Sequence, residues 1–179
     1  KDTVGYYEIH TVKPSLDLQL QSDSSSSFRA FYGMSLERDT AGLLYHTIGV
    51  NGAKYEQYNR SPEFWLQLPY LKGDLYIISL GTNEAQNPNF DKKTFYLDID
   101  SFVKNVKFIS PDADIILTTA PDSYLRGIPN PILREVNSVI RNYCFDKQVA
   151  LWDLFKMANG KKDRKSTRLN SSHTVISYA

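Results

Sequence analysis

Polar residues stand directly after an apolar run of the sequence, at a position where side chains could stabilise negative charge. Residues 77–86, IISLGTNEAQ, change from apolar to polar at Gly81, and Asn83 follows with a neutral amide donor. Amide donors beside backbone N–H groups form oxyanion holes, which bind the charge that develops on a carbonyl oxygen during acyl transfer. Asn83 could equally cap the following turn, and Glu84 could orient the loop or lie at the surface as a solvated carboxylate.

Two further segments have the same character. Residues 48–53, IGVNGA, contain two glycines, which allow close backbone approach and leave amides free to face an anion. These residues could equally form an ordinary turn. Neither of the glycine patterns of phosphate-binding loops, GxGxxG and GxxxxGK[ST], occurs in the chain. Residues 118–124, TTAPDSY, follow another apolar run. Asp122 and Tyr124 could line a sugar-binding cleft, or Pro121 could open an ordinary turn.

These segments fall at the ends of predicted strands. Residues 73–81 and 113–121 are continuous apolar runs, and a shorter run begins at 148. Helices are predicted between and after them, with apolar residues at a spacing of three and four: Phe95, Ile99, Phe102, Val103 and Val106, then Ile132, Val136, Val139, Ile140 and Tyr143. Strand–helix alternation predicts a parallel sheet covered on both faces. Ligands bind beyond the carboxyl ends of such strands, so the three polar segments should open on one edge.

The first part of the chain has a different pattern. Residues 4–12, 15–21, 24–37 and 42–50 read as short strands joined by small turns, which favours antiparallel pairing. Residues 52–71 are broken by two prolines and predict one or two short helices, with Ser61 as the N-cap before Pro62. We therefore expect the C-terminal part of a β domain over residues 1–45 and a partial α/β domain over 46–162.

Both ends of the sequence are unusual. It begins at Lys1 with residues typical of the middle of a strand, which predicts an N-terminal truncation. Residues 163–179, DRKSTRLNSSHTVISYA, resemble the translation of a short-read sequencing adapter over their whole length. We expect this tail to be non-native and disordered, which removes His173 from any catalytic argument.

Composition narrows the possible functions. The 179 residues are 41% hydrophobic and 13% aromatic, enough for a substantial core, and the formal charge of +1 gives no electrostatic reason to bind nucleic acid or an anionic membrane. No apolar run approaches the roughly 20 residues that span a bilayer. Cys144 is the single cysteine, so no internal disulfide is possible. On a predicted helix it is expected to be a small buried hydrophobe.

IGVNGA, followed 30 residues later by ISLGTNEA, resembles the second and third sequence blocks of the SGNH, or GDSL-like, esterase superfamily. The resemblance covers about residues 28–160 and implies a flavodoxin-like three-layer α/β/α sheet. The third block is usually Gly-x-Asn-Asp, whereas residues 81–84 read Gly-Thr-Asn-Glu. In this departure the chain resembles a branch of bacterial carbohydrate esterases. That branch also resembles this chain in an accessory β domain before GVNGA and in PDSY after the next strand.

The resemblance implies a role for each of the candidate site residues. The Gly52 backbone N–H and the Asn83 side-chain amide would form the oxyanion hole. The substrate-binding residues would be Asn51, Thr82, Glu84, Asp122 and Tyr124. The substrate would be an acylated carbohydrate or another small ester, most plausibly an O-acetylated polysaccharide or peptidoglycan. No metal or organic cofactor is implied, and the family resemblance suggests export to the periplasm or the outside of the cell.

The superfamily also needs a serine nucleophile and a histidine base. Residues 33–36, GMSL, approach Gly-Asp-Ser-Leu, but Ser35 lies in an alternating strand pattern with no helix after it, so we interpret it as an ordinary strand residue. The sequence contains no Asp-x-x-His. His10 and His46 lie in predicted strands as packed or surface residues, and Asp153 reads as a helix N-cap or strand-end residue.

We therefore expect the serine upstream of the first residue, the Asp-His block beyond Gly160, and a chain that is inactive alone. The alternative is a non-catalytic flavodoxin-like module that binds a small anion or sugar through GVNG and GTNEA. A β-sandwich carbohydrate module as the main function would require residues 1–45 to be complete, and they are short for a sandwich of ~100 residues. Flanking sequence with a Gly-Asp-Ser block and an Asp-x-x-His block would favour the esterase.

Overall fold

The computed structural model divides the chain into two compact units, Lys1–Asp39 and Thr40–Ala179. It describes residues 7–11, 13, 17, 19, 21, 33–37, 40–125 and 128–159. The described residues of the first unit are exposed and none lies in a strand. The rest of the strands expected over 4–12, 15–21 and 24–37, and the tail after Asn159, lie outside the described residues.

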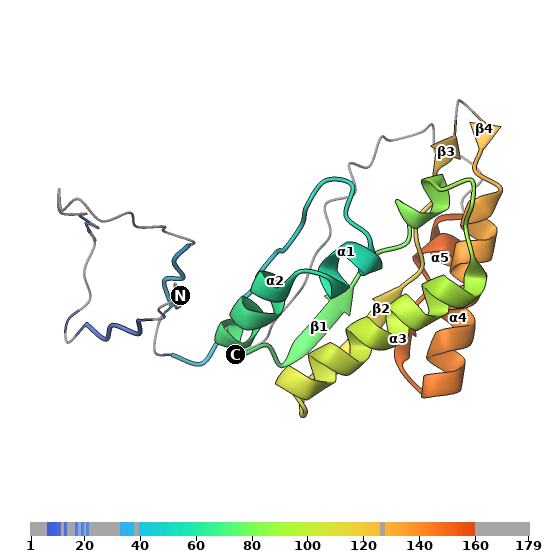
Figure 1. Ribbon diagram of the computed structural model, residues 1–179. Helices are drawn as coiled ribbons and strands as arrows, with labels where there is room; N and C mark the ends of the chain where they lie inside the picture. The colour runs from blue at the N-terminus through green and yellow to red at the C-terminus, as the bar shows by residue number, and fades with distance from the viewer. Residues whose placement is uncertain are drawn as a thin grey trace. The chain divides into compact units, whose positions relative to one another are not determined.

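A three-stranded parallel sheet forms the centre of the second unit (Figure 1). Its strands are β1 (Leu75–Ile78), β2 (Asp114–Thr118) and β5 (Ala150–Trp152), in the order β1-β2-β5. Tyr76 is paired with Ile115, and Leu117 with Leu151. The predicted parallel pairing of the apolar runs is therefore confirmed.

Two long helices make the crossovers between these strands. They are α3 (Lys92–Ile109) and α4 (Ile132–Lys147), which pack against each other. Asp91 caps α3 by accepting a hydrogen bond from the Thr94 N–H at 2.7 Å. The helical spacing located their inner faces correctly: all the residues predicted to face inward are buried except Ile132, which is half-buried. Cys144 is buried on α4, and burial raises the pKa of its thiol to about 11.

Helices were expected on both faces of the sheet, and the structure places the two long helices on one of them. The strand order does not reverse, and right-handed crossovers in one direction place α3 and α4 on the same face. Tyr76, Ile78, Ile115 and Leu117 are buried in one core with these helices. On the opposite face of β1 and β2, Leu75, Ile77 and Ile116 are half-buried, Thr118 is buried and Asp114 is exposed; all three residues of β5 are exposed.

The strand expected over residues 42–50 does not form. Leu44, His46 and Ile48 are half-buried and alternate with exposed neighbours, as in a strand, and Ile48 packs against the core. A strand also needs a paired backbone. Within the described part of the chain the sheet ends at β1 and gives this segment no partner.

The segment after Gly52 forms the short helices that its prolines predict. They are α1 (Tyr55–Asn59) and α2 (Pro62–Gln67), continued by η1 (Leu68–Leu71), with Ser61 at the N-cap position of α2. Tyr55 joins α1 to α3 through an edge-to-face contact with Phe102, with ring centroids 5.5 Å apart. The remaining elements are η2 (Glu84–Gln86), the β3 (Tyr124–Leu125) and β4 (Ile128–Pro129) hairpin, and α5 (Leu154–Asn159). None of the described helices is long and apolar enough to cross a membrane.

Gly81 ends the β1 segment in a conformation that other residues rarely adopt, with φ +118°. A Cβ at this position would lie 3.1 Å from Val136 Cγ1 and 3.3 Å from Ile140 Cδ1, both on α4. We predict that Gly81→Ala lowers the free energy of unfolding by about 2–4 kcal/mol, because backbone strain and overpacking add. Urea denaturation measures this. Gly42→Ala, whose Cβ would meet only a backbone oxygen at 3.9 Å, is the control and should change stability by less than about 1 kcal/mol.

Candidate active site

Two loops that are 30 residues apart in the sequence meet at the carboxyl end of β1. Asn83 Nδ2 donates a hydrogen bond to the Ala53 carbonyl oxygen at 2.8 Å. Asn83 occupies the N-cap position of η2, but its side chain makes no capping hydrogen bond there. The side chain therefore bridges the loops rather than capping its own turn. IGVNGA and GTNEA lie together, as the strand-end argument predicts.

Gly52 forms the tip of the turn that precedes Ala53. Its φ is +80°, and the Ala53 N–H closes the turn by donating to the Val50 carbonyl at 3.1 Å. A positive φ at the third position of a four-residue turn is typical of a type II turn, which favours glycine there. Gly52 is exposed, and no heavy atom lies within 4 Å of a Cβ built on it. A substrate could therefore approach the backbone closely at this position.

Asn83 keeps donor capacity after binding Ala53. A side-chain amide carries two N–H groups, and one of them is used by the Ala53 carbonyl. The second N–H could donate to a ligand, since Asn83 is half-buried and not closed off from solvent. The first hydrogen bond also fixes the orientation of the amide plane. A preorganised donor of this kind is what stabilisation of a developing oxyanion requires.

Glu84 makes a second link between the same two loops. Its Oε1 accepts a hydrogen bond from the N–H of Tyr55, the first residue of α1, at 2.9 Å. The side chain is 8% exposed, and this burial raises the pKa of the carboxyl group, although nearby backbone N–H groups oppose the rise. Glu84 thus orients the loop, which was one of its two interpretations from sequence. Its role toward substrate stays a prediction.

The other predicted substrate-binding residues lie in loops at strand ends. Asn51 is exposed in the Gly52 turn, and Thr82 is half-buried beside Asn83. Asp122 and Tyr124 follow β2, and both are exposed, with Tyr124 at the start of β3. The ends of β1 and β2 open on one edge because the two strands are parallel.

Two buried asparagines that sequence reasoning missed hold these strand ends in place. Asn137 on α4 is completely buried; it accepts from the Ala120 N–H at 2.8 Å and donates to the Ala120 carbonyl at 2.9 Å. Asn130 donates to the Ala85 carbonyl at 2.7 Å. Asn137 stands four residues after Leu133 and three before Ile140, both buried. This helical spacing could have predicted that Asn137 is buried, whereas no pattern in the sequence marks Asn130.

Asp153, after β5, anchors the third strand end. It accepts hydrogen bonds from Arg141 Nε at 2.9 Å, from the Thr119 hydroxyl at 2.9 Å and from the Lys156 N–H at 3.1 Å. The last bond confirms the N-cap interpretation. The Arg141 guanidinium is the main cause that lowers the pKa of Asp153 to about 2. This carboxylate is therefore committed to structure.

The described residues provide no nucleophile–base pair at Asn83. Ser35 belongs to the other unit, and its hydroxyl donates to Glu37 Oε1 at 2.8 Å. His46 Nε2 is buried without a hydrogen-bond partner, and His10 is exposed beside Glu8. No three His, Cys, Asp or Glu side chains in the described ranges converge as metal ligands would.

A small parallel sheet with flanking helices, and an amide donor at a strand end, place the molecule among the α/β proteins that hold their sites at the carboxyl ends of strands. The chain belongs to the GDSL-like Lipase/Acylhydrolase family, whose sequence model matches residues 14–173. This family is one of ester hydrolases.

Solved structures agree with this assignment. A peptidoglycan O-acetylesterase is similar over 59% of this chain and 32% of its own, with 28% identity and a TM-score of 0.55. A lipase/acylhydrolase from Enterococcus faecalis is similar over 69% of this chain and 63% of its own, with 18% identity and a TM-score of 0.50, which shows the fold alone. The chain thus spans less than two thirds of either protein. A search of curated proteins finds no match.

The Arg141–Asp153 contact generates a pH prediction. The pKa of Asp153 is about 2 in the folded chain, against an ordinary value of 3.8, so its contribution to stability is present above about pH 4 and is lost as the pH falls toward 2. Asp153→Asn should cost about 1–2 kcal/mol at pH 7 in urea unfolding, and less at pH 3. Asp112→Asn, at an exposed turn, should have little effect. An undiminished cost at pH 3 would show that the charge is not the cause.

Proposed function

We propose that this chain supplies the oxyanion-binding half of an SGNH-type serine esterase, within a parent enzyme that removes O-acetyl groups from a polysaccharide or peptidoglycan. The observation that carries the proposal is the 2.8 Å hydrogen bond from Asn83 to Ala53. It places an oriented amide donor beside the Gly52 turn, at the edge of the sheet where ligands bind.

The chemistry assigned to the two residues is electrostatic. When a serine attacks an ester, negative charge moves onto the carbonyl oxygen. The second N–H of Asn83 and the backbone N–H of Gly52 would donate to that oxygen, more strongly as the charge develops. Their orientation is set before substrate arrives, since Asn83 is held by Ala53 and Gly52 lies in a closed turn.

The nucleophile and the base are proposed to lie outside residues 40–159. The hydroxyl of Ser35 is already bound to Glu37, and His46 Nε2 has no hydrogen-bond partner to activate. The edge of β1 opposite β2 would accept a further parallel strand, since β1 pairs only with β2 among the described residues. A serine at the carboxyl end of such a strand would lie beside Asn83.

Support for the substrate class comes from the structural comparison. The peptidoglycan O-acetylesterase is 28% identical over the aligned part, above the level at which similarity indicates fold alone. The exposed Asp122 and Tyr124 near the same edge offer a carboxylate and an aromatic face, which suit a sugar. Acetate on a glycan hydroxyl is therefore the ester proposed.

The first test is made on the 179-residue chain itself. We predict that it hydrolyses p-nitrophenyl acetate no faster than a buffer and albumin control, because no nucleophile–base pair lies at the proposed oxyanion donors among the residues that the structure describes. Ser35→Ala should change nothing. Turnover well above background that is lost in Ser35→Ala would contradict this prediction and make Ser35 the nucleophile.

The second test uses the full reading frame, recovered from the source DNA, with O-acetylated peptidoglycan as substrate. Asn83→Ala should lower kcat by roughly 10²–10³-fold with little change in KM, because the donor acts mainly in the transition state. Asn142→Ala, an exposed asparagine on α4, is the matched control and should retain activity. An equal loss in both variants, or an inactive full-length protein that still binds glycan, would favour the non-catalytic binding module.

A further inference from the structure

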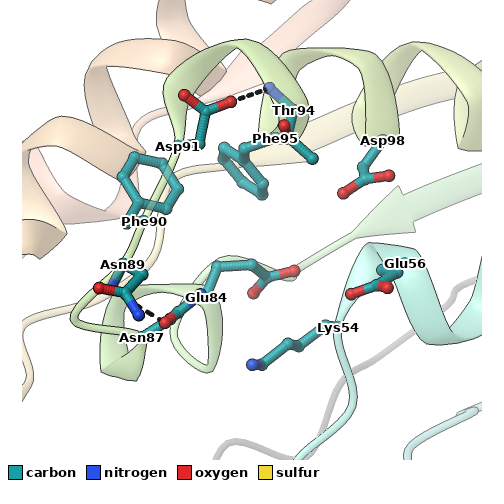
Figure 2. A pocket seen from close by; sticks show the side chains of 10 residues that line it. All are labelled: Lys54, Glu56, Glu84, Asn87, Asn89, Phe90, Asp91, Thr94, Phe95 and Asp98. Atoms are coloured by element: carbon teal, nitrogen blue, oxygen red, sulfur yellow. Dashed lines mark hydrogen bonds between the residues drawn. The ribbon is translucent and has the colours of Figure 1, made fainter.

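A pocket of about 230 Å³ lies beside the candidate oxyanion site. It is lined by Lys54 and Glu56 at the start of α1, by Glu84, by Asp91 at the N-cap of α3 and by Asp98 further along that helix (Figure 2). Phe90 and Phe95 supply part of its wall. Because Lys54 follows Ala53 and Glu84 follows Asn83, the pocket adjoins both loops of the candidate site.

Acidic side chains predominate in the lining of this pocket. Four carboxylates line it, and Lys54 is the single basic residue among the lining side chains. The carboxylates come from three separate segments, so they are not simply one solvated helix face. Glu56 is ion-paired with Arg60 at 2.9 Å, on the same helix. Burial, followed by repulsion from Glu56, raises the pKa of Asp98, although Arg60 opposes the rise.

Glu84 shows where a ligand would bind. Its Oε1 is satisfied by the Tyr55 N–H, but its Oε2 is buried and has no hydrogen-bond partner among the described residues. Figure 2 shows the carboxylate between Phe95 and the Lys54–Glu56 segment, inside the ring of lining side chains. A buried carboxylate oxygen left without a donor is costly, and a cationic donor removes that cost.

We propose that this pocket binds a protonated primary amine, with its ammonium group donating to Glu84 Oε2. Three N–H donors on a compact cation suit a site where several carboxylates face a small volume, and charge-assisted hydrogen bonds are the stronger kind. A metal ion fits less well, because these carboxylates do not converge as metal ligands would. The proposal is independent of esterase activity, so it can be tested on the chain whether or not that chain is active.

The test compares three sugars that differ at one carbon: glucosamine, N-acetylglucosamine and glucose. Each is titrated into the ¹⁵N-labelled 179-residue chain at pH 6.5 and followed by NMR. Glucosamine should bind with a Kd on the order of millimolar and shift the amides of Tyr55 and Glu84. The two neutral sugars should bind at least tenfold more weakly. Equal binding of all three, or no shift at these amides, would overturn the proposal.

Variants locate the interaction. Glu84→Gln keeps an acceptor for the Tyr55 N–H but removes the charge, and should weaken glucosamine binding at least tenfold. Glu63→Gln makes the same change at an exposed position of α2 outside the pocket and should bind like the unaltered chain. If Glu84→Gln unfolds, Asp98→Asn replaces it, with a severalfold loss expected. Unchanged binding in a folded pocket variant would overturn the proposal.

Lys54 provides a test in the opposite direction. Lys54 is the one basic residue in the pocket lining, its charge acts on Glu84, and its ammonium would compete with a bound cation for the carboxylates. Lys54→Met removes that competitor and should tighten glucosamine binding severalfold. Weaker binding in this variant would show that the lysine assists the ligand, as it would with an anion, and would count against a cation site.

Discussion

The candidate site depends on two hydrogen bonds that join one loop to another 29 and 30 residues away. Asn83 Nδ2 holds the Ala53 carbonyl, and the Glu84 carboxylate holds the Tyr55 N–H. The two hydrogen bonds run in opposite directions: in the loop after β1, Asn83 is a donor and Glu84 is an acceptor. Adjacent residues thus pair with residues on either side of Lys54, which fixes position and orientation together. Neither bond alone would prevent rotation of the loop.

This pair of bonds works only because the ends of the strands are fixed. Gly81 turns the chain away from β1 where α4 leaves no room for a Cβ. After β2, Asn137 forms hydrogen bonds with both backbone groups of Ala120. After β5, Asp153 accepts hydrogen bonds from Arg141 and Thr119. At the edge where the candidate site lies, each strand of the sheet is therefore followed by a residue that fixes the position of the chain. Buried polar groups are costly unless they are paired; Asn137 pairs with the backbone of Ala120, and Asp153 pairs mainly with the side chains of Arg141 and Thr119.

The spacing of apolar residues predicted the helices and the parallel strands well, but it predicted less well which elements pair or pack with one another. The apolar spacing of α3 and α4 identified faces that are buried, because a helix repeats its own geometry. The residues 42–50 alternate as a strand does, but pairing is decided elsewhere in the chain, and no described strand lies beside them. Helix cover on both faces stays a prediction: the strand order β1-β2-β5 places α3 and α4 on one face, and helix cover depends on strand order. Asn83 was placed correctly by its position after an apolar strand, whereas its contact with Ala53 could not be read from either loop alone.

The contacts that hold Asn83 and Gly52 at the candidate site lie within the second unit. The hydrogen bonds that orient Asn83 and close the Gly52 turn are local to residues 50–84, and the α3 aromatic rings hold Tyr55 from the other side. An oxyanion donor set by the scaffold needs no rearrangement when a serine attacks, which is the advantage of preorganisation. The buried charge of Glu84 is part of the same arrangement: its Oε1 builds the loop, and its Oε2 leaves the loop's inner side negative. The negative pocket thus follows from the way the donor is held.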